Sequence, residues 1–191
     1  MKIIGIIGKN GAGKDELADY LHQTHGLAVL SLGDLVREIA ANENIIPTRN
    51  NLMDISAHYL TSRGKGYFIQ KIIEKIERKK WDMTAILGIR TLNDVQTLRE
   101  CFGKDFILVH VQTLDQEKRY ERAKSRNELC DPQTYIEFLS YEEAEESQFS
   151  ISVTAEQADL VIEFDGTQEA FHEKIEQLLV QPFLSETMVR Y

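Results

Sequence analysis

One short motif constrains this chain more than any other feature. The residues Gly8-Lys9-Asn10-Gly11-Ala12-Gly13-Lys14 fit the pattern G-x-x-x-x-G-K. They follow the apolar run Ile3–Ile7, which is typical of a strand buried on both faces, and they precede a helical pattern over residues 14–24. Glycines let backbone amides point at an anion, the helix N-terminus adds positive potential, and Lys14 adds a charge between the β- and γ-phosphates. The motif predicts a binding site for ATP on a strand–loop–helix unit.

The residue after this motif departs from its usual form. A Ser or Thr hydroxyl would normally contact Mg²⁺ there, but this chain has Asp15, followed by Glu16. A carboxylate is a natural ligand or water holder for a hard cation, so Asp15 is the candidate metal-binding residue. Capping the following helix is the alternative role for Asp15.

The rest of the chain alternates apolar runs with longer amphipathic stretches. This alternation predicts an α/β fold with a mostly parallel sheet. Strands are expected at residues 3–7, 27–30, 84–89, 106–111 and 160–164, and helices at 14–24, from 34, 50–63, 66–80, 92–101, 115–126, 134–147 and 167–179. Pro182 and the polar residues after it are expected to form a surface appendage.

Length and composition exclude several classes of protein. The 191 residues suit a single domain, and 31 acidic against 22 basic residues give a net charge of −9, which argues against general nucleic-acid binding. The longest apolar runs are far shorter than a membrane span, and Met1 leads directly into a strand-like run, so we expect neither a membrane segment nor a signal peptide. The two cysteines are best interpreted as free thiols of a cytoplasmic protein.

Two arginines follow predicted strands in patterns that resemble a known group of enzymes. Gly33-Asp34-Leu35-Val36-Arg37 resembles the GD-x-x-R segment of adenylate kinase and other nucleoside monophosphate kinases, and Gly88-Ile89-Arg90 resembles their DG-x-R segment. The resemblance implies that Arg37 and Arg90 hold the phosphate of the acceptor, with Asp34 beside them. Asp34 is also expected to cap its helix, and an ordinary surface pair with Arg37 is the alternative. The acid that opens the second segment in relatives is replaced by Leu87.

A basic helix is predicted over residues 115–126. Arg119, Arg122 and Arg126 are spaced i, i+3, i+7 and share one face of it. The same group of kinases has a basic helix here, followed by a mobile lid, so the resemblance implies that Arg122 and Arg126 close on the γ-phosphoryl and that Arg122 contacts ATP. A solvated face paired with acids such as Glu121 and Glu142 is the alternative.

The end of the chain resembles the closing strand and helix of dephospho-CoA kinase. In those proteins the loop after the last strand lies against adenine, which implies that Gly166 and Thr167 contact the nucleotide. The resemblance extends over residues 1–180 and implies a three-layer α/β/α P-loop fold with a five-stranded parallel sheet. It also implies a helical acceptor-binding insert at about 34–80, a lid at about 122–148 and a tail at 181–191.

These observations predict an ATP-dependent phosphotransferase that uses Mg²⁺ and acts on a small phosphate-bearing acceptor. Lys14, Arg90, Arg122 and Arg126 are the expected catalytic residues. A nucleoside monophosphate, a deoxynucleotide and dephospho-CoA all remain open as acceptors, and the oligomeric state is open as well. A nucleotide-binding regulator that has lost turnover and a simple ATPase are the alternatives, and Asp15 and Leu87 are the observations that favour them.

Other polar residues are interpreted as structural. No pair of histidines has the spacing of a metal site with nearby cysteine, and His110 is expected to be a satisfied core residue because it lies in an apolar run. The acidic run Glu142, Glu143, Glu145 and Glu146 is expected to be a solvated helix face.

Overall fold

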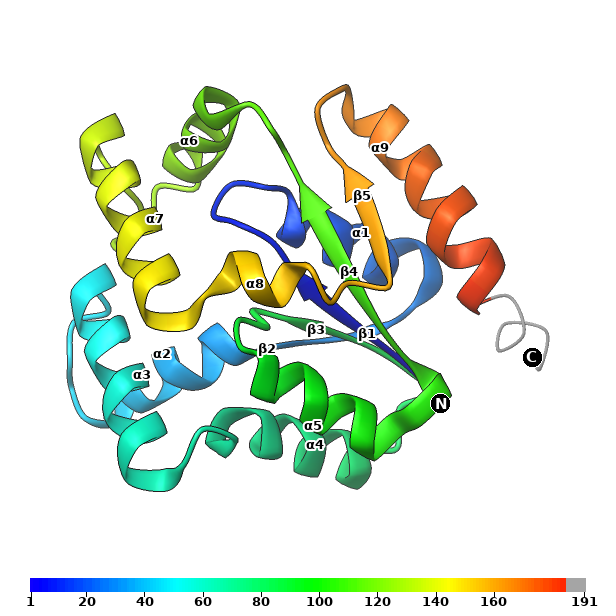
Figure 1. Ribbon diagram of the computed structural model, residues 1–191, viewed down its shortest axis with the longest axis horizontal. Coiled ribbons are helices and arrows are strands. Elements are labelled where there is room, and N and C mark those ends of the chain that lie inside the picture. Colours follow the sequence, from blue (N-terminus) through cyan, green and yellow to red (C-terminus); the bar gives the residue numbers. More distant parts are fainter. Residues whose placement is uncertain (185–191) are drawn as a thin grey trace.

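The computed structural model describes residues 1–184, and within this range five parallel strands form one sheet (Figure 1). In spatial order the strands are β2 (Ala28–Ser31), β3 (Met83–Leu87), β1 (Lys2–Ile7), β4 (Phe106–Gln112) and β5 (Leu160–Glu163). On β1, Ile4 pairs with Ala85 of β3 and with Ile107 of β4. Because β1 is central, the loop that follows it leaves from the middle of the carboxyl edge of the sheet.

Alternate side chains of the strands feed two separate cores. Ile3 and Ile7 point to one face, which is covered by α2 (Leu32–Asn42), α4 (Tyr67–Lys79), α5 (Leu92–Phe102) and α8 (Ile151–Ala155). Ile4 and Ile6 point to the other, which is covered by α1 (Lys14–His25), α9 (Gln168–Ile175) and the π-helical segment η2 (Glu176–Leu184). The expected three-layer α/β/α fold is confirmed.

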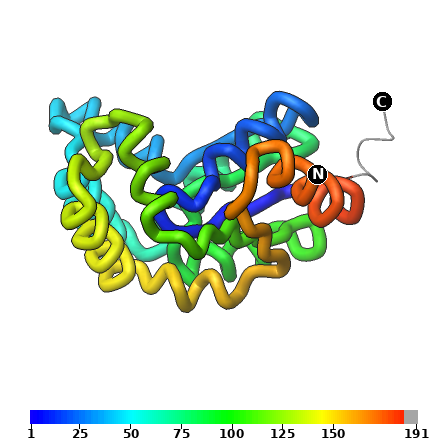
Figure 2. The backbone as a smooth tube through the Cα atoms, turned by 90° about the horizontal axis from the view of Figure 1, so that it is seen from above, coloured from blue at the N-terminus to red at the C-terminus, as the bar shows by residue number. Residues whose placement is uncertain are grey.

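The remaining helices stand at the carboxyl edge of the sheet. Helix α3 (Arg49–Arg63) follows α2, while α6 (Gln116–Ser125) and α7 (Tyr135–Phe149) follow β4; a short 3₁₀ turn, η1 (Gly103–Asp105), precedes β4. Figures 1 and 2 both place α7 beside α2 and α3 at one end of the molecule, with η2 at the opposite end. The helices that surround the carboxyl ends of the strands therefore come from two distant parts of the sequence.

Side-chain caps explain where several of these helices begin. Thr134 and Glu137 form a capping box at α7, and the Thr48 hydroxyl accepts a hydrogen bond from the Asn51 amide at α3. The Ser31 hydroxyl caps α2 by accepting from the Asp34 amide, so the expectation that Asp34 caps this helix is wrong. Ser31 does so because α2 begins two residues earlier than the apolar pattern indicates.

The end of the chain differs most from expectation. The last helix continues through η2 to Leu184, past Pro182, and Leu179 and Leu184 are fully buried against α1 and the sheet. Residues 181–184 are thus part of the fold and not of a surface appendage, while residues 185–191 lie outside the described range. Within residues 1–184, no helix has both the length and the apolarity needed to cross a membrane.

Candidate nucleotide and acceptor site

The loop after β1 has the shape expected of a phosphate loop. Gly11 and Gly13 have φ angles of 71° and 101°, which favour glycine, and a Cβ atom on Gly11 would collide with the carbonyl of Arg119. The Ala12 amide donates to the Lys9 carbonyl, and the Lys14 ammonium donates to the same oxygen at 2.8 Å. Burial lowers the pKa of Lys14 to about 8, although Asp15 and Glu145 oppose that shift. Lys14 is thus folded over the loop.

Arg126 closes one side of this loop. Its guanidinium donates to the side chains of Asn10 and Asp131, each at 2.8 Å, and to Asp15 at 3.2 Å. The Asn10 Nδ2 atom is buried and has no hydrogen-bond partner among the described residues, so the loop holds a donor without an acceptor. Asp15 lies in the first turn of α1, directly after Lys14, and does not cap the helix. Its carboxylate is therefore available to pair with a cation.

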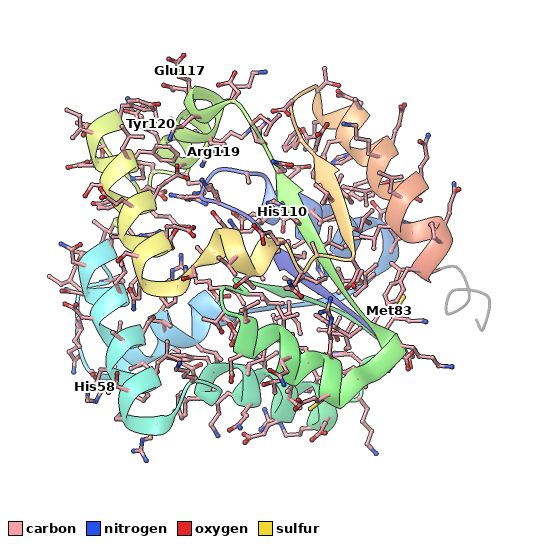
Figure 3. The ribbon with its side chains drawn as sticks, in the orientation of Figure 1. His58, Met83, His110, Glu117, Arg119 and Tyr120 are labelled. Carbon is pink, nitrogen blue, oxygen red and sulfur yellow. The ribbon has the colours of Figure 1, made fainter. Side chains whose placement is uncertain are left out.

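The three arginines of α6 do not converge on one point. Figure 3 shows Arg119 and Tyr120 on α6 near α7, with Glu117 on its outer side. Arg119 donates to the Asn10 carbonyl and pairs with Glu142, as the alternative interpretation of this face expected, but it is buried and not solvated. Its role is to join α6, α7 and the phosphate loop.

Arg122 lies on the opposite side of the loop from Arg126. Its guanidinium donates to the Thr113 hydroxyl and the Phe164 carbonyl, both at 3.0 Å, and stacks 3.8 Å from the centre of the Phe164 ring. The Thr113 hydroxyl in turn donates to the Ala12 carbonyl. Arg122 is therefore placed between the phosphate loop and the end of β5, away from Arg126.

The loop after β5 lies beside Arg122. Phe164 follows β5 and packs against Gly13, so this loop borders the phosphate loop directly. Gly166 is exposed, and the Thr167 hydroxyl caps α9 by accepting from the Ala170 amide. The structure thus brings Gly166 and Thr167 near the phosphate loop, on the side of Arg122.

A cavity of about 500 Å³ opens from the phosphate loop toward α2 and α3. Lys14, Arg37, Arg90 and Arg126 line it, as does Leu87 in the place of the missing acid. Arg37 donates to Asp34 at 3.1 Å and to Glu128 at 3.2 Å. It thus forms the pair on α2 that was the alternative to phosphate binding, and a second link to the segment after α6. Two cations predicted for the acceptor and two predicted for ATP therefore share one cavity.

Glu145 on α7 contradicts its expected exposure. Its side chain is only 8% exposed, and Oε1 lies 2.6 Å from an Arg49 nitrogen and 3.2 Å from an Arg90 nitrogen. Burial alone would raise the pKa of Glu145, but the nearby Arg90 and Arg49 guanidinium groups lower it overall. An acidic run on a helix indicates a solvated face only when the partner helix carries no buried cations, and here α3 supplies one.

Arg49 is a cavity-lining cation that the sequence motifs missed. It is the first residue of α3 and lines the same cavity. One signal was present: a cation in the first turn of a helix is disfavoured by the helix dipole, so another interaction must favour it.

The side chain of Asp94 has a structural role beside the cavity. Asp94 is buried in the capping box of α5 and accepts from the Arg90 and Thr91 amides, so it orients the Arg90 backbone and is committed to that cap. His110 is not a satisfied core residue. It is half-buried on β4 (Figure 3), and its side chain forms no hydrogen bond with the described residues. Together with Lys9 it lines a second cavity of about 510 Å³. Burial, then the charges of Lys14 and Lys9, lower the pKa of His110.

A phosphate loop at the carboxyl end of the central strand, facing a cationic cavity, defines a P-loop nucleotide-binding protein with a kinase-like fold. Residues 7–136 match the family described as AAA domain (AAA_17). The chain is 32% identical to a UPF0200 protein of Halobacterium salinarum over 181 residues, which cover 94% of this chain and 93% of that protein. The chain belongs to the UPF0200 family.

A further relative shares this family, and several solved structures share the fold. The chain is 31% identical to the UPF0200/UPF0201 protein of Archaeoglobus fulgidus over 95% of its own length, and it spans 56% of that longer protein. Solved structures with this fold include shikimate kinase from Aquifex aeolicus, with a TM-score of 0.51 at 14% identity over 96% of this chain and 99% of that one. Another is a gluconokinase from Sinorhizobium meliloti, with a TM-score of 0.57 at 12% identity over 100% and 98%. At these identities the likeness concerns the fold alone.

Proposed function

We propose that this protein is an ATP-dependent phosphotransferase that moves the γ-phosphoryl group of ATP to a small anionic acceptor. One observation carries the proposal: Lys14 and Arg126 at the phosphate loop share a single cavity with Arg37 of α2, Arg49 of α3 and Arg90 after β3. Phosphoryl transfer needs two substrates in line and neutralisation of charge, and little covalent help from the protein.

On the ATP side, the loop amides of residues 8–14 and the Lys14 ammonium hold the β- and γ-phosphates. Arg126 changes partners from Asp15 to the transferred phosphoryl group. Arg122, Gly166 and Thr167 border the adenine, because they lie together beside the phosphate loop. This division assigns Arg122 to nucleotide binding and Arg126 to the reacting phosphate.

The residues present fit Mg²⁺ that arrives with the nucleotide. Mg²⁺ commonly takes one or two carboxylates, substrate phosphates and water. Asp15 and Asp19 lie one turn apart on α1 and both line the cavity. When bound there, Mg²⁺ would neutralise phosphate charge, and Asp15 would hold it directly or through water once Arg126 has turned to the phosphoryl group.

The acceptor carries an anionic group on the arginines of the far side. A phosphate held by Arg37 and Arg90 is the first candidate, on the resemblance to nucleoside monophosphate kinases. A carboxylate is the second, and the charge balance of the cavity favours it. The lining cations are Lys14, Arg37, Arg49, Arg90 and Arg126, and the lining acids are Asp15, Asp19, Asp34, Glu128 and Glu145. A cavity so nearly neutral attracts a dianion only weakly.

A thermal-shift screen tests the two-substrate proposal. A ligand that binds only the folded protein raises the midpoint of unfolding. Candidate acceptors with phosphate or carboxylate groups are added with and without a non-hydrolysable ATP analogue and Mg²⁺. We expect at least one acceptor to raise the midpoint beyond the effect of the analogue alone. If ATP binds, no acceptor adds to it and no ADP forms, the protein is a nucleotide-binding regulator. If ADP forms at the same rate without any acceptor, it is an ATPase.

A further inference from the structure

Arg49 is a buried cation whose hydrogen-bond donors are not all satisfied. Its side chain is 14% exposed, one of its terminal nitrogens contacts Glu145 at 2.6 Å, and its guanidinium lies 5.7 Å from the centre of the Tyr141 ring. Its Nε atom is buried and has no hydrogen-bond partner among the described residues. A buried donor without an acceptor is unfavourable, so an oxygen acceptor that reaches this guanidinium would stabilise it.

Glu145 sets the charge at this place. Its Oε1 atom serves both Arg49 and Arg90, and the three side chains come from α3, the end of β3 and α7. Two guanidinium groups and one carboxylate leave a net charge of +1. Three other acids of the cavity are paired with other cations, since Asp34 and Glu128 pair with Arg37, and Asp15 pairs with Arg126. The fourth, Asp19, lies on α1 and makes no ion pair with Arg49 or Arg90 among the described residues.

We propose that Arg49 and Arg90, held together by Glu145, form the subsite for a monoanionic oxyanion on the acceptor. This inference rests on the proposed function, because it takes the cavity to be the acceptor site. One negative charge neutralises this net charge of +1, whereas the second charge of a dianion would be desolvated in the cavity without a cation to balance it. Glu145 adds to this cost, because a fixed carboxylate repels a dianion about twice as strongly as a monoanion at the same distance. Glu145 is therefore a positioning residue for Arg49 and the residue that selects a carboxylate or another single negative charge over a phosphate monoester.

Two small probes of equal shape isolate the effect of charge. Methyl sulfate carries one negative charge, and methyl phosphate carries nearly two at pH 7.5, because its second pKa is near 6. Each is titrated into the protein with Mg²⁺ and the ATP analogue AMP-PNP in saturating amounts, so that the phosphate loop is filled. Binding is followed by the NMR signal of the Arg49 Nε–H group. We expect methyl sulfate to shift this signal and to bind at least as tightly as methyl phosphate.

Substitution of Glu145 tests the selection itself. Glu145→Gln keeps the size of the side chain and removes its charge, so the affinity ratio should move toward methyl phosphate by about ten- to a hundredfold. Glu145→Asp keeps the charge and should keep the preference for the monoanion. Glu143→Gln, an exposed position on the same helix, is the matched control and should leave the ratio as in the wild type. An unchanged ratio in folded Glu145→Gln overturns the inference.

Arg49→Lys keeps the test decisive if Glu145→Gln fails to fold. Lysine preserves the charge but not the guanidinium donors, so methyl sulfate affinity should fall about tenfold. Undiminished binding to this variant would refute the subsite.

Failure of the proposed function looks different from failure of this inference. If AMP-PNP does not bind, or if neither probe shifts any arginine signal of the cavity, the cavity is not an acceptor site and the proposed function fails with it. If the probes bind through Arg37 and leave Arg49 unmoved, the function stands and only the Arg49–Arg90–Glu145 subsite is lost.

Discussion

At the scale of single residues, Lys14 carries the strongest prediction. Lys14→Ala should lower ATP affinity by about ten- to a hundredfold, because a charge-assisted hydrogen bond to phosphate contributes about 1.5–3 kcal/mol. Calorimetry measures the affinity, and circular dichroism checks that the variant is folded. Lys104, an exposed lysine in η1 outside the phosphate loop, provides the matched control, and Lys104→Ala should leave ATP affinity unchanged. Equal ATP affinity in wild type and Lys14→Ala would contradict the assignment of the loop.

The pKa of Lys14 gives a second prediction at this scale. Because burial lowers this pKa to about 8, the free protein loses the Lys14 proton as pH rises through that value. ATP binds the ammonium form, so affinity should be level near pH 7 and then fall by up to about tenfold per pH unit above 8. The measurement is calorimetry between about pH 7 and 9.5 without divalent cations. Lys14→Ala should show no such fall, and a parallel fall in both proteins would assign it to another group.

A third prediction concerns Arg37 and Arg90, the two arginines assigned to the acceptor. Arg37→Ala and Arg90→Ala should each weaken acceptor binding by about ten- to a hundredfold. ATP affinity should stay nearly unchanged, because neither side chain contacts the phosphate loop among the described residues. Arg99 is the matched control: it pairs with Asp159 away from this cavity, and its substitution should leave both affinities intact. Loss of ATP binding in Arg37→Ala or Arg90→Ala would show that the cavity is divided differently.

Sequence motifs found residues whose position follows from the backbone alone. Lys14 and Arg90 follow strands of a parallel sheet, so knowledge of the strand ends is enough to bring them to one edge. Arg49 and Glu145 lie far apart in the sequence, and only the tertiary arrangement of α3 and α7 brings them together. Whether an acidic run is solvated or buried therefore depends on the element it faces, which local sequence patterns do not identify.

At the scale of elements, the strands were predictable because burial on both faces leaves continuous apolar runs. Helix α8 was not predicted, because five residues are too few to show a helical period. The expected lid at 122–148 is also not uniform: α7 has a capping box and buries Phe138, Glu145 and Phe149, whereas residues 127–129 between α6 and α7 are exposed.

This contrast predicts a pattern of amide exchange. Exposed backbone with few buried neighbours opens easily, so residues 127–129 should exchange faster than the middle of α7. Binding of the ATP analogue with an acceptor should slow exchange in this segment, because Arg126 and the Arg37–Glu128 link join it to both sides of the cavity. Hydrogen–deuterium exchange with mass spectrometry measures both effects. Uniform protection over residues 122–148, unchanged by ligands, would contradict a closing segment.

At the scale of the whole molecule, the fold brings the two halves of the site together. The topology places the phosphate loop after the central strand of the sheet (Figure 1). Helices α1, α2, α3 and α7 all contribute lining residues to one cavity beside it. The alternating strand and helix pattern was enough to predict the α/β fold with a mostly parallel sheet, but not the strand order that makes β1 central. The charge balance of the cavity was not predictable, because it depends on which side chains of α2, α3 and α7 turn inward.

Phosphorus NMR of the complete reaction tests the central claim most directly. Wild-type protein is incubated with Mg²⁺, ATP and each acceptor that raises the unfolding midpoint, with Lys14→Ala as the inactive control. We predict that ADP forms together with one new phosphate ester in equal amounts, and only when acceptor and wild-type protein are both present. ADP with inorganic phosphate at a rate independent of the acceptor, or bound ATP that stays intact with every acceptor, would contradict the account.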